Sequence, residues 1–166
     1  MSSLQGTAKG NFNAVKNKVM EQLSLGDKVL ASHFMLSVRE RPDITLRVAA
    51  TQIPEMMRHE IESYGHLGSG SNQQGNLKNT GQITVTVNEY MDGKASEFIY
   101  DTIKNKKYLD LDLSITPEDT NLEPIASWEM LKCSINSEVV DVANEDISGT
   151  INFPLTITYN WIEKTK

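Results

Sequence analysis

Residues 151–163 read INFPLTITYNWIE, and this stretch near the C-terminus decides the fold class. Asn and Thr hold most of the positions between its apolar residues, which are Ile151, Phe153, Leu155, Ile157, Tyr159 and Trp161. Because side chains along a strand alternate between its two faces, the pattern predicts one β-strand with an apolar face and a neutral polar face. At roughly 12 residues, this strand is about twice the usual length.

Similar alternation predicts strands at residues 33–38, 83–90 and 109–115. Residues 44–50 also alternate, and the turn residues Pro42 and Asp43 before them predict a tight hairpin with residues 33–38. Further extended segments are expected at residues 52–64, because the residue before Pro54 disfavours helix, and at residues 127–142, with a break at residues 136–137. Turns are expected at residues 116–119 and 144–149.

Two segments have helical periodicity instead. Residues 10–25 predict a helix that ends near Gly26 and follows nine extended residues, with an apolar stripe of Phe12, Val15, Val19 and Leu23. Residues 92–108 predict a second helix that begins at Asp92, with a buried stripe of Ala95, Phe98, Ile99, Thr102 and Ile103. The chain is therefore expected to be α+β and dominated by antiparallel sheet.

Residues 64–82 are rich in Gly, Ser, Asn and Gln, which predicts a flexible loop. At roughly 18 residues, the loop is longer than compact domains usually tolerate without a function. We therefore expect a neighbouring subunit to hold it.

The net charge of −6 is unevenly distributed along the chain. Residues 1–107 carry 13 Lys or Arg and 11 Asp or Glu, whereas residues 108–166 carry 3 Lys and 11 Asp or Glu. An acidic half argues against tight nucleic-acid binding, and it fits either simple solubility or a surface that repels phosphate. The lone cysteine excludes an intrachain disulfide, and the absence of a signal-like or long apolar segment predicts a soluble protein made in the cytoplasm.

Candidates for chemistry are weak. His59 and His66, near Glu60 and Glu62, match no metal-binding spacing and are expected to be scattered surface residues. The sequence has no nucleophile elbow, phosphate loop or dinucleotide fingerprint, so no enzyme activity, metal or cofactor is predicted.

Three further features favour structural interpretations. Asp110 and Asp112 alternate with leucines, as on the solvent face of a half-buried strand. Cys133 alternates with Leu131 and Ile135, as a small core residue does. The aromatic pair Tyr159 and Trp161 is expected to pack in the core rather than to stack on bases, because no basic residue flanks it before Lys164.

In its order of elements the chain resembles the tail tube proteins of contractile-tailed bacteriophages, whose relatives form the inner tube of type VI secretion systems. The segments that carry the resemblance are residues 33–55, 81–103, 128–141 and 151–163. The likeness covers about residues 33–163. The N-terminal helix and the Gly-rich loop differ from the short-arm members of this family. The chain could therefore be the main tube subunit or a paralogue that starts or caps the tube.

The resemblance implies an antiparallel β-sandwich or partial barrel flanked by a helix over residues 33–166, preceded by an N-terminal arm and helix over residues 1–32. It implies a non-catalytic subunit of stacked hexameric rings that conduct DNA in the virion tail, made in the cytoplasm of the bacterial host. Implied partners are further copies of the chain, the tail sheath, a baseplate or initiator protein, the tape measure protein and passing DNA. The alternatives are a tube-initiator or baseplate ring, the inner tube of an injection or secretion system, and a non-polymerising binding domain or small enzyme.

Within this family picture, the long strands would line the lumen and the less compact segments would join subunits. The candidates for lining the lumen are Thr84, Thr86, Asn88, Thr156, Thr158 and Asn160. The candidates for subunit contacts are Phe12, Val15, Val19, Leu23, Gly65, Leu67, Gly68, Gly70, Gly75 and Leu77. Pro154 cannot donate to a sheet, so a bulge, or a nitrogen that faces away from the neighbouring strand, is expected there.

Overall fold

The structure is a computed structural model that describes residues 5–117 and 123–166. Residue contacts divide the chain into two compact units, Met1–Ser32 and His33–Lys166. The turn predicted at residues 116–119 lies partly outside the described residues.

The first unit contains helix α1 (Gln5–Leu23), and the chain leaves it with Gly26 in the left-handed region at φ 81°. The helix begins before residue 10, so the prediction that the first nine residues are extended is wrong for residues 5–9. Gln, Ala and Lys among those residues favour helix, which explains the earlier start. Gly26 is suited to its position because it tolerates positive φ.

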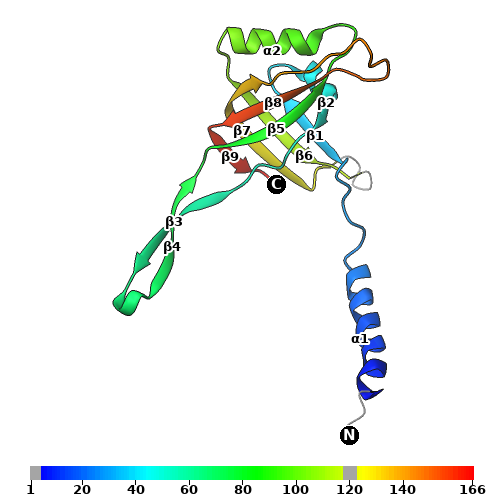
Figure 1. Ribbon diagram of the computed structural model, residues 1–166, viewed down its shortest axis with the longest axis vertical. Helices are drawn as coiled ribbons and strands as arrows, with labels where there is room; N and C mark the ends of the chain where they lie inside the picture. The colour runs from blue at the N-terminus through cyan, green and yellow to red at the C-terminus, as the bar shows by residue number, and fades with distance from the viewer. Residues whose placement is uncertain (1–4, 118–122) are drawn as a thin grey trace. The chain divides into compact units, whose positions relative to one another are not determined.

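The second unit is built on a seven-stranded antiparallel sheet, which confirms the predicted α+β partial barrel. The strands follow the order β1-β6-β7-β8-β5-β2, and β9 pairs with β7 beside that path. Their bounds are β1 (Phe34–Val38), β2 (Val48–Ala50), β5 (Gly81–Asn88), β6 (Leu109–Ile115), β7 (Ala126–Ser137), β8 (Asn152–Tyr159) and β9 (Trp161–Lys164). Helix α2 (Lys94–Lys104) lies across one end of the curved sheet (Figure 1).

The core lies inside the curve of the sheet, and the alternating strands supply most of it. The alternation of β5 and β6 predicts that Ile83, Val85, Val87, Leu109, Leu111, Leu113 and Ile115 point inward, and all of these are buried except Ile115, which is half-buried. Helix α2 closes the core with Ala95, Phe98, Ile99 and Thr102, whereas Ile103, predicted to be buried, is exposed. The helix begins at Lys94, two residues after the predicted start.

The C-terminal segment forms two strands rather than the predicted single long one. Strand β8 pairs with β5 and with the second half of β7, and then Asn160 redirects the chain so that β9 pairs with the first half of β7. The backbone N–H of Asn160 donates to Leu131 O, and its side-chain amide donates to Lys132 O. The bend shifts the alternation by one residue, so Tyr159 and Ile162 are buried and Trp161 is 42% exposed. The prediction of core packing therefore holds for Tyr159 and is wrong for Trp161.

Strand β7 contains a matching irregularity at Lys132, which has a positive φ of 48°. The register with β6 shifts here, and Met130 and Cys133, three residues apart, both point into the core. Leu131 therefore does not share the inward face with Cys133, contrary to the predicted alternation. The β7 strand ends at Ser137, where the sequence predicted a break.

The hairpin predicted at residues 33–50 does not form. Strand β1 pairs with β6, and Pro42–Arg47 is a 3₁₀ helix that carries the chain to β2, which pairs with β5. Pro42 stands in the first turn of this helix, where a fixed φ and a missing N–H are tolerated. Ile44 is buried and Leu46 is exposed, as a helical turn rather than an alternating strand requires.

Pro154 fits its strand in the second of the two predicted ways. Residues 152–159 pair with β5 without a register shift, so β8 has no bulge toward β5 at this point. The carbonyl of Pro154 accepts from the N–H of Glu138, just beyond the end of β7. Because N and O of one strand residue point to the same side, the proline nitrogen faces away from β5 and leaves that ladder intact.

Candidate assembly surfaces

The Gly-rich segment predicted to be a flexible loop is a β-hairpin. Strand β3 (Met57–Tyr64) pairs with β4 (Gly70–Lys78), and a short 3₁₀ turn, His66–Gly68, joins them. The prediction missed β4 because its Gly, Ser, Asn and Gln residues have low strand propensity and do not alternate with apolar residues. The extended conformation predicted for residues 52–64 is confirmed at β3.

The hairpin forms its own two-stranded sheet, which Figure 1 shows apart from the larger one. Every side chain of β3 is exposed, and its apolar residues include Ile61 and Tyr64. At the turn Leu67 is 93% exposed and has a positive φ of 59°. Exposed apolar side chains on a ribbon with its own backbone pairing are typical of an element that binds a partner.

Gly75 lies at a bulge in this hairpin. The register of β3 with β4 shifts between Arg58 and Glu60, so Gly75 and Asn76 face the single residue His59. A Cβ on Gly75 would stand 2.8 Å from the carbonyl oxygen of His59, closer than real Cβ atoms come. The sequence predicted Gly75 as a contact residue, and its observed place is inside the ribbon, where glycine permits the bulge.

A neutral polar surface covers the outer face of β5, β8 and the second half of β7. Cross-strand pairs bring the predicted lumen residues together, because Thr84 pairs with Thr156 and Thr86 lies opposite Pro154. Asn88 and Thr158 belong to the same face, whereas Asn160 lies at the bend after β8. The side chain of Gln82 donates to Thr158 Oγ1 at 3.4 Å and extends this neutral face.

Sequence reasoning missed the contribution of β7 to this surface. Ser134 pairs with Thr158, and Asn136 pairs with Thr156. The signal was present, because Ser134 and Asn136 alternate with the core residues Cys133 and Ile135. The neutral face therefore spans three neighbouring strands, and Glu138, just beyond β7, lies at its edge, where it accepts from Thr156 Oγ1 at 3.4 Å.

The outer face of β6 and of the first half of β7 is charged, in contrast to that of β5 and β8. Arg39, which follows β1, forms ion pairs with Asp112 at 2.8 Å and with Glu129 at 2.7 Å. These two carboxylates raise the pKa of Arg39 above its ordinary value through hydrogen bonds. The observed solvent exposure of Asp112 agrees with its predicted place on the outer strand face. Asp110 accepts the backbone N–H of Lys132, so it supports the bulge in β7.

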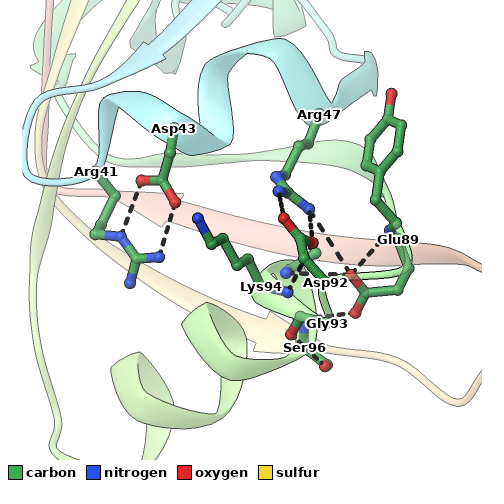
Figure 2. Close-up of polar contacts among 10 residues, drawn as sticks. Arg41, Asp43, Arg47, Glu89, Asp92, Gly93, Lys94 and Ser96 are labelled. Carbon is green, nitrogen blue, oxygen red and sulfur yellow. Dashed lines mark hydrogen bonds and ion pairs between the residues drawn. The ribbon is translucent and has the colours of Figure 1, made fainter.

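An ion-pair cluster fixes the start of α2, as Figure 2 shows. Arg47 donates to Asp92 at 2.9 Å, and its guanidinium stacks 5.1 Å from the ring of Tyr90. Glu89 accepts hydrogen bonds from the backbone N–H groups of Ala95 and Ser96 and so caps the helix. Arg47, which pairs with Asp92, belongs to the 3₁₀ helix and lies 45 positions earlier in the sequence. The cluster joins three segments and positions α2 over the core.

The cluster shifts the ionisation of its acids in the expected direction. The hydrogen bonds from Arg47 lower the pKa of Asp92 to about 2. Burial opposes ionisation of Glu89, but backbone N–H donors, led by that of Ser96, hold its pKa below the ordinary value. Both carboxylates are therefore ionised at neutral pH, when Arg47 can pair with them.

Helix α1 displays the predicted apolar stripe to solvent. Phe12 is 75% exposed, and Val15, Val19 and Leu23 are also exposed. Lys18 and Glu21 form an ion pair at 2.8 Å on the helix. An apolar stripe that a helix leaves exposed to solvent is typical of a surface that binds a partner.

The remaining candidates give no sign of chemistry among the described residues. No group of three His, Cys, Asp or Glu residues in residues 5–117 and 123–166 could hold a metal ion. His59 lies on β3 and His66 lies in the hairpin turn, both exposed. Cys133 is fully buried, and desolvation raises the pKa of its thiol to about 12. Over the same residues, no helix has the length and apolar character needed to cross a membrane.

Comparison with known proteins bears on the fold. No protein-family model matches the sequence, and no relative is found among curated proteins. Among solved structures, the tube-terminating cap of the anti-feeding prophage matches with a TM-score of 0.68 and 14% identity, over 84% of this chain and 92% of the cap chain. A chain of the PVC sheath–tube complex, from an extracellular contractile injection system, matches with a TM-score of 0.67 and 16% identity, over 87% and 96% of the two chains.

The sheath/tube terminator of the same PVC system matches with a TM-score of 0.68 and 16% identity, over 84% of this chain and 98% of the other. These neighbours are parts of tube and sheath assemblies rather than enzymes. Identities this low establish the fold, which is the one that the sequence resemblance predicted. The chain therefore has the fold of the tube and tube-terminating proteins of contractile injection systems.

Proposed function

We propose that this chain is a structural subunit of the tube of a contractile injection machine, and that it catalyses no reaction. Copies assemble into hexameric rings, the rings stack, and the stack forms a conduit for DNA. The observation that carries the proposal is the uncharged polar surface across β5, β8 and β7, on a body with the tube-protein fold. The domain boundary falls after residue 32, so that the arm serves assembly and the body forms the wall.

The neutral surface suits the wall of a conduit. Thr, Ser, Asn and Gln side chains stay hydrated without attracting phosphate, because nucleic-acid affinity comes mainly from Lys and Arg. Thr84, Thr86, Asn88, Thr156 and Thr158 line the lumen in this proposal, and Asn160 stands at its margin. The overall charge of −6 adds weak repulsion of DNA, screened beyond roughly 10 Å at moderate salt.

The exposed hairpin suits a contact between subunits. Its side chains, including those of Leu67 and Leu77, are exposed, so a contact with a neighbour would bury apolar area that the free chain leaves in water. Gly65, Gly68 and Gly70 lie at or beside the turn of this ribbon. The contact candidates of α1, namely Phe12, Val15, Val19 and Leu23, offer a second exposed apolar surface.

The proposed partners follow from the machine. The sheath encloses the tube, a baseplate or initiator ring nucleates it, the tape measure protein occupies it during assembly, and DNA later slides through it. The proposed location is the virion tail, after synthesis in the cytoplasm of the host bacterium. An injection or secretion machine that moves protein instead of DNA would use the same wall.

Negative-stain electron microscopy of the concentrated full chain tests the proposal. Hollow rods of uniform width are expected, and end-on views give the number of subunits in each ring. Monodisperse small particles at every concentration, in the presence of a preformed ring as nucleus, would overturn it. Thr84→Lys and Thr156→Lys would place positive charge on the neutral wall and should slow DNA ejection without loss of assembly, and unchanged ejection kinetics would refute the role of the neutral wall.

A tube-terminating or initiating ring is the second candidate. Two of the structural neighbours are a tube-terminating cap and a sheath/tube terminator, which favours this alternative. Such a ring forms once and does not stack. Isolated rings without rods in the same micrographs would favour it over the main tube subunit.

A further inference from the structure

An apolar groove of about 280 Å³ runs along α2 on the body of the protein. Ile99, Tyr100 and Ile103 of α2 form one side, and Ser137 and Phe153 form the other. Tyr100 is exposed, and the Lys104 ammonium lies 5.4 Å from its ring. The groove therefore offers an apolar floor with an aromatic edge, open to solvent.

An acidic loop rises from the rim of this groove. Ser137 and Phe153 line the groove and flank the loop of residues 138–151, so both ends of the loop start there. The loop has no Lys or Arg, and its acids are Asp141, Glu145 and Asp146, together with Glu138, whose carboxylate accepts from Thr156 Oγ1 on the neutral face instead. It also exposes apolar side chains, among them Val139, Val142 and Ile147, the last 97% exposed. Lys104 also lines the groove, so the groove itself favours an apolar ligand, and it is the acids of the loop that favour a basic one.

Helix α1 has the complementary chemistry. Residues 1–32 carry four Lys and two acidic residues, whereas residues 33–166 carry twelve Lys or Arg and twenty Asp or Glu. Lys16 follows Phe12 by four residues, so its charge lies beside the apolar stripe. Phe12 is the only aromatic residue of residues 1–32, and aromatic side chains are frequent anchors in protein interfaces.

We propose that α1 of one copy docks into the groove beside α2 of a second copy. The stripe around Phe12 and Val15 covers Tyr100 and Ile103, and Lys16 faces the acidic loop. The simplest rival is pairing of two α1 helices, which would bring two net-positive arms together, and the test below distinguishes it. The inference rests on the proposed self-assembly, and it adds a specific link from one copy to the next.

Disulfide trapping between two variants of the full chain tests the link. One chain carries Val15→Cys, and the other, made longer by a tag, carries Ile103→Cys. The native Cys133 is buried and does not compete. After mixing, concentration and mild oxidation, we expect a mixed disulfide dimer as the main cross-linked product. Thr84→Cys, on the neutral face, replaces Ile103→Cys in the control mixture and should give little product.

The outcomes separate this inference from the tube proposal. Absence of the mixed dimer, or homodimers of Val15→Cys in its place, overturns the docking of α1 whether or not rods form. A mixed dimer without rods or rings supports the docking and counts against the tube function.

A charge-reversal pair tests the electrostatic part. Lys16→Glu should lower the yield of mixed dimer roughly two- to fivefold, as expected for loss of one exposed ion pair. Lys28→Glu carries the same charge change beyond the end of α1 and should leave the yield unchanged. Equal losses for both variants would overturn the assignment of Lys16 to the acidic loop.

Discussion

The seven-stranded sheet and the β3–β4 hairpin are both antiparallel, but their stability has different sources. In the large sheet, inward residues such as Leu111, Val85 and Leu155 are almost fully buried. In the hairpin every side chain of β3 is exposed, and backbone pairing is its main internal support. Isolated two-stranded ribbons are at best marginally stable in water, whereas a sheet closed over a core is stable alone.

This difference indicates where function resides. The body needs no partner to bury its core, so its inward residues report on folding. The hairpin leaves Ile61, Tyr64 and Leu67 in water, which is the reason for proposing that it contacts a neighbouring subunit. Changes to the two regions should therefore separate folding from assembly.

Removal of the hairpin should have the largest effect. Deleting residues 68–76 takes away most of β4 and the last residue of the turn, Gly68. We expect complete loss of rods in electron micrographs, because β3 alone presents no ordered surface. The thermal midpoint of the remaining body should change little, because none of the buried core residues belongs to the deleted segment. Rods from the deletion variant would show that the hairpin is not an assembly element.

Truncation of one core residue and one hairpin residue tests the same contrast quantitatively. Leu111→Ala should lower the free energy of unfolding by about 2–5 kcal/mol, because it leaves a cavity in a closed core. Ile61→Ala should change it by less than about 0.5 kcal/mol, because the side chain is exposed in the free chain. Urea unfolding of the unassembled chain measures both. The contrast between the regions fails if the two losses are similar.

Two glycines, one in the large sheet and one in the hairpin, allow a second comparison of the two regions. Gly81 of β5 lies opposite Tyr159, and a Cβ there would collide with the tyrosine hydroxyl and ring. Gly81→Ala should therefore cost about 1–3 kcal/mol of unfolding free energy, as overpacking of a core does. Gly75→Ala meets a backbone carbonyl in the hairpin bulge instead, so it should weaken rod formation and leave the unfolding of the body unchanged. Equal unfolding curves for wild type and Gly81→Ala would contradict this account.

The sequence predicts the body well wherever alternation carries the information. β5, β6 and the buried face of α2 were all predictable, because burial of one face imposes a period on the sequence. The C-terminal strand was harder, because Asn160 and Lys132 shift the alternation of β8–β9 and of β7 by one residue. These shifts depend on backbone hydrogen bonds between the two segments, which a single-strand pattern does not encode.

The hairpin and the neutral face mark the limit of such reasoning. Strand β4 has no buried face, so nothing in residues 70–78 imposes a strand period, and the composition predicts a loop instead. The 3₁₀ helix at Pro42–Arg47 imitates a strand, because Ile44, Leu46 and Val48 alternate by chance. For the polar face, individual strands were predictable, but the joining of β5, β8 and β7 follows from the sheet order, which is a tertiary property.

Removal of the cap on α2 should have an intermediate effect on the body. Glu89→Ala leaves the N–H groups of Ala95 and Ser96 without their acceptor and should cost about 0.5–2 kcal/mol. Glu97→Ala, in the first turn of the same helix, removes an acid without a capping bond and serves as control. Urea unfolding should separate the two variants. If Glu97→Ala lowered the free energy of unfolding as much as Glu89→Ala, the effect of Glu89 would come from its charge near the helix N-terminus and not from its capping hydrogen bonds.

Acid should produce the smallest change, and it should act through the Arg47–Asp92 pair of the body. Arg47 lowers the pKa of Asp92 to about 2 in the folded chain, below the ordinary value of 3.8. A carboxylate with a depressed pKa stabilises the folded state above its unfolded pKa, and this contribution is lost as the pH falls from about 4 toward about 2. Thermal midpoints of wild type and Asp92→Asn, measured from pH 5 to pH 2, should therefore converge as the pH falls. A constant gap between the two proteins would show that the Arg47–Asp92 pair does not titrate with folding.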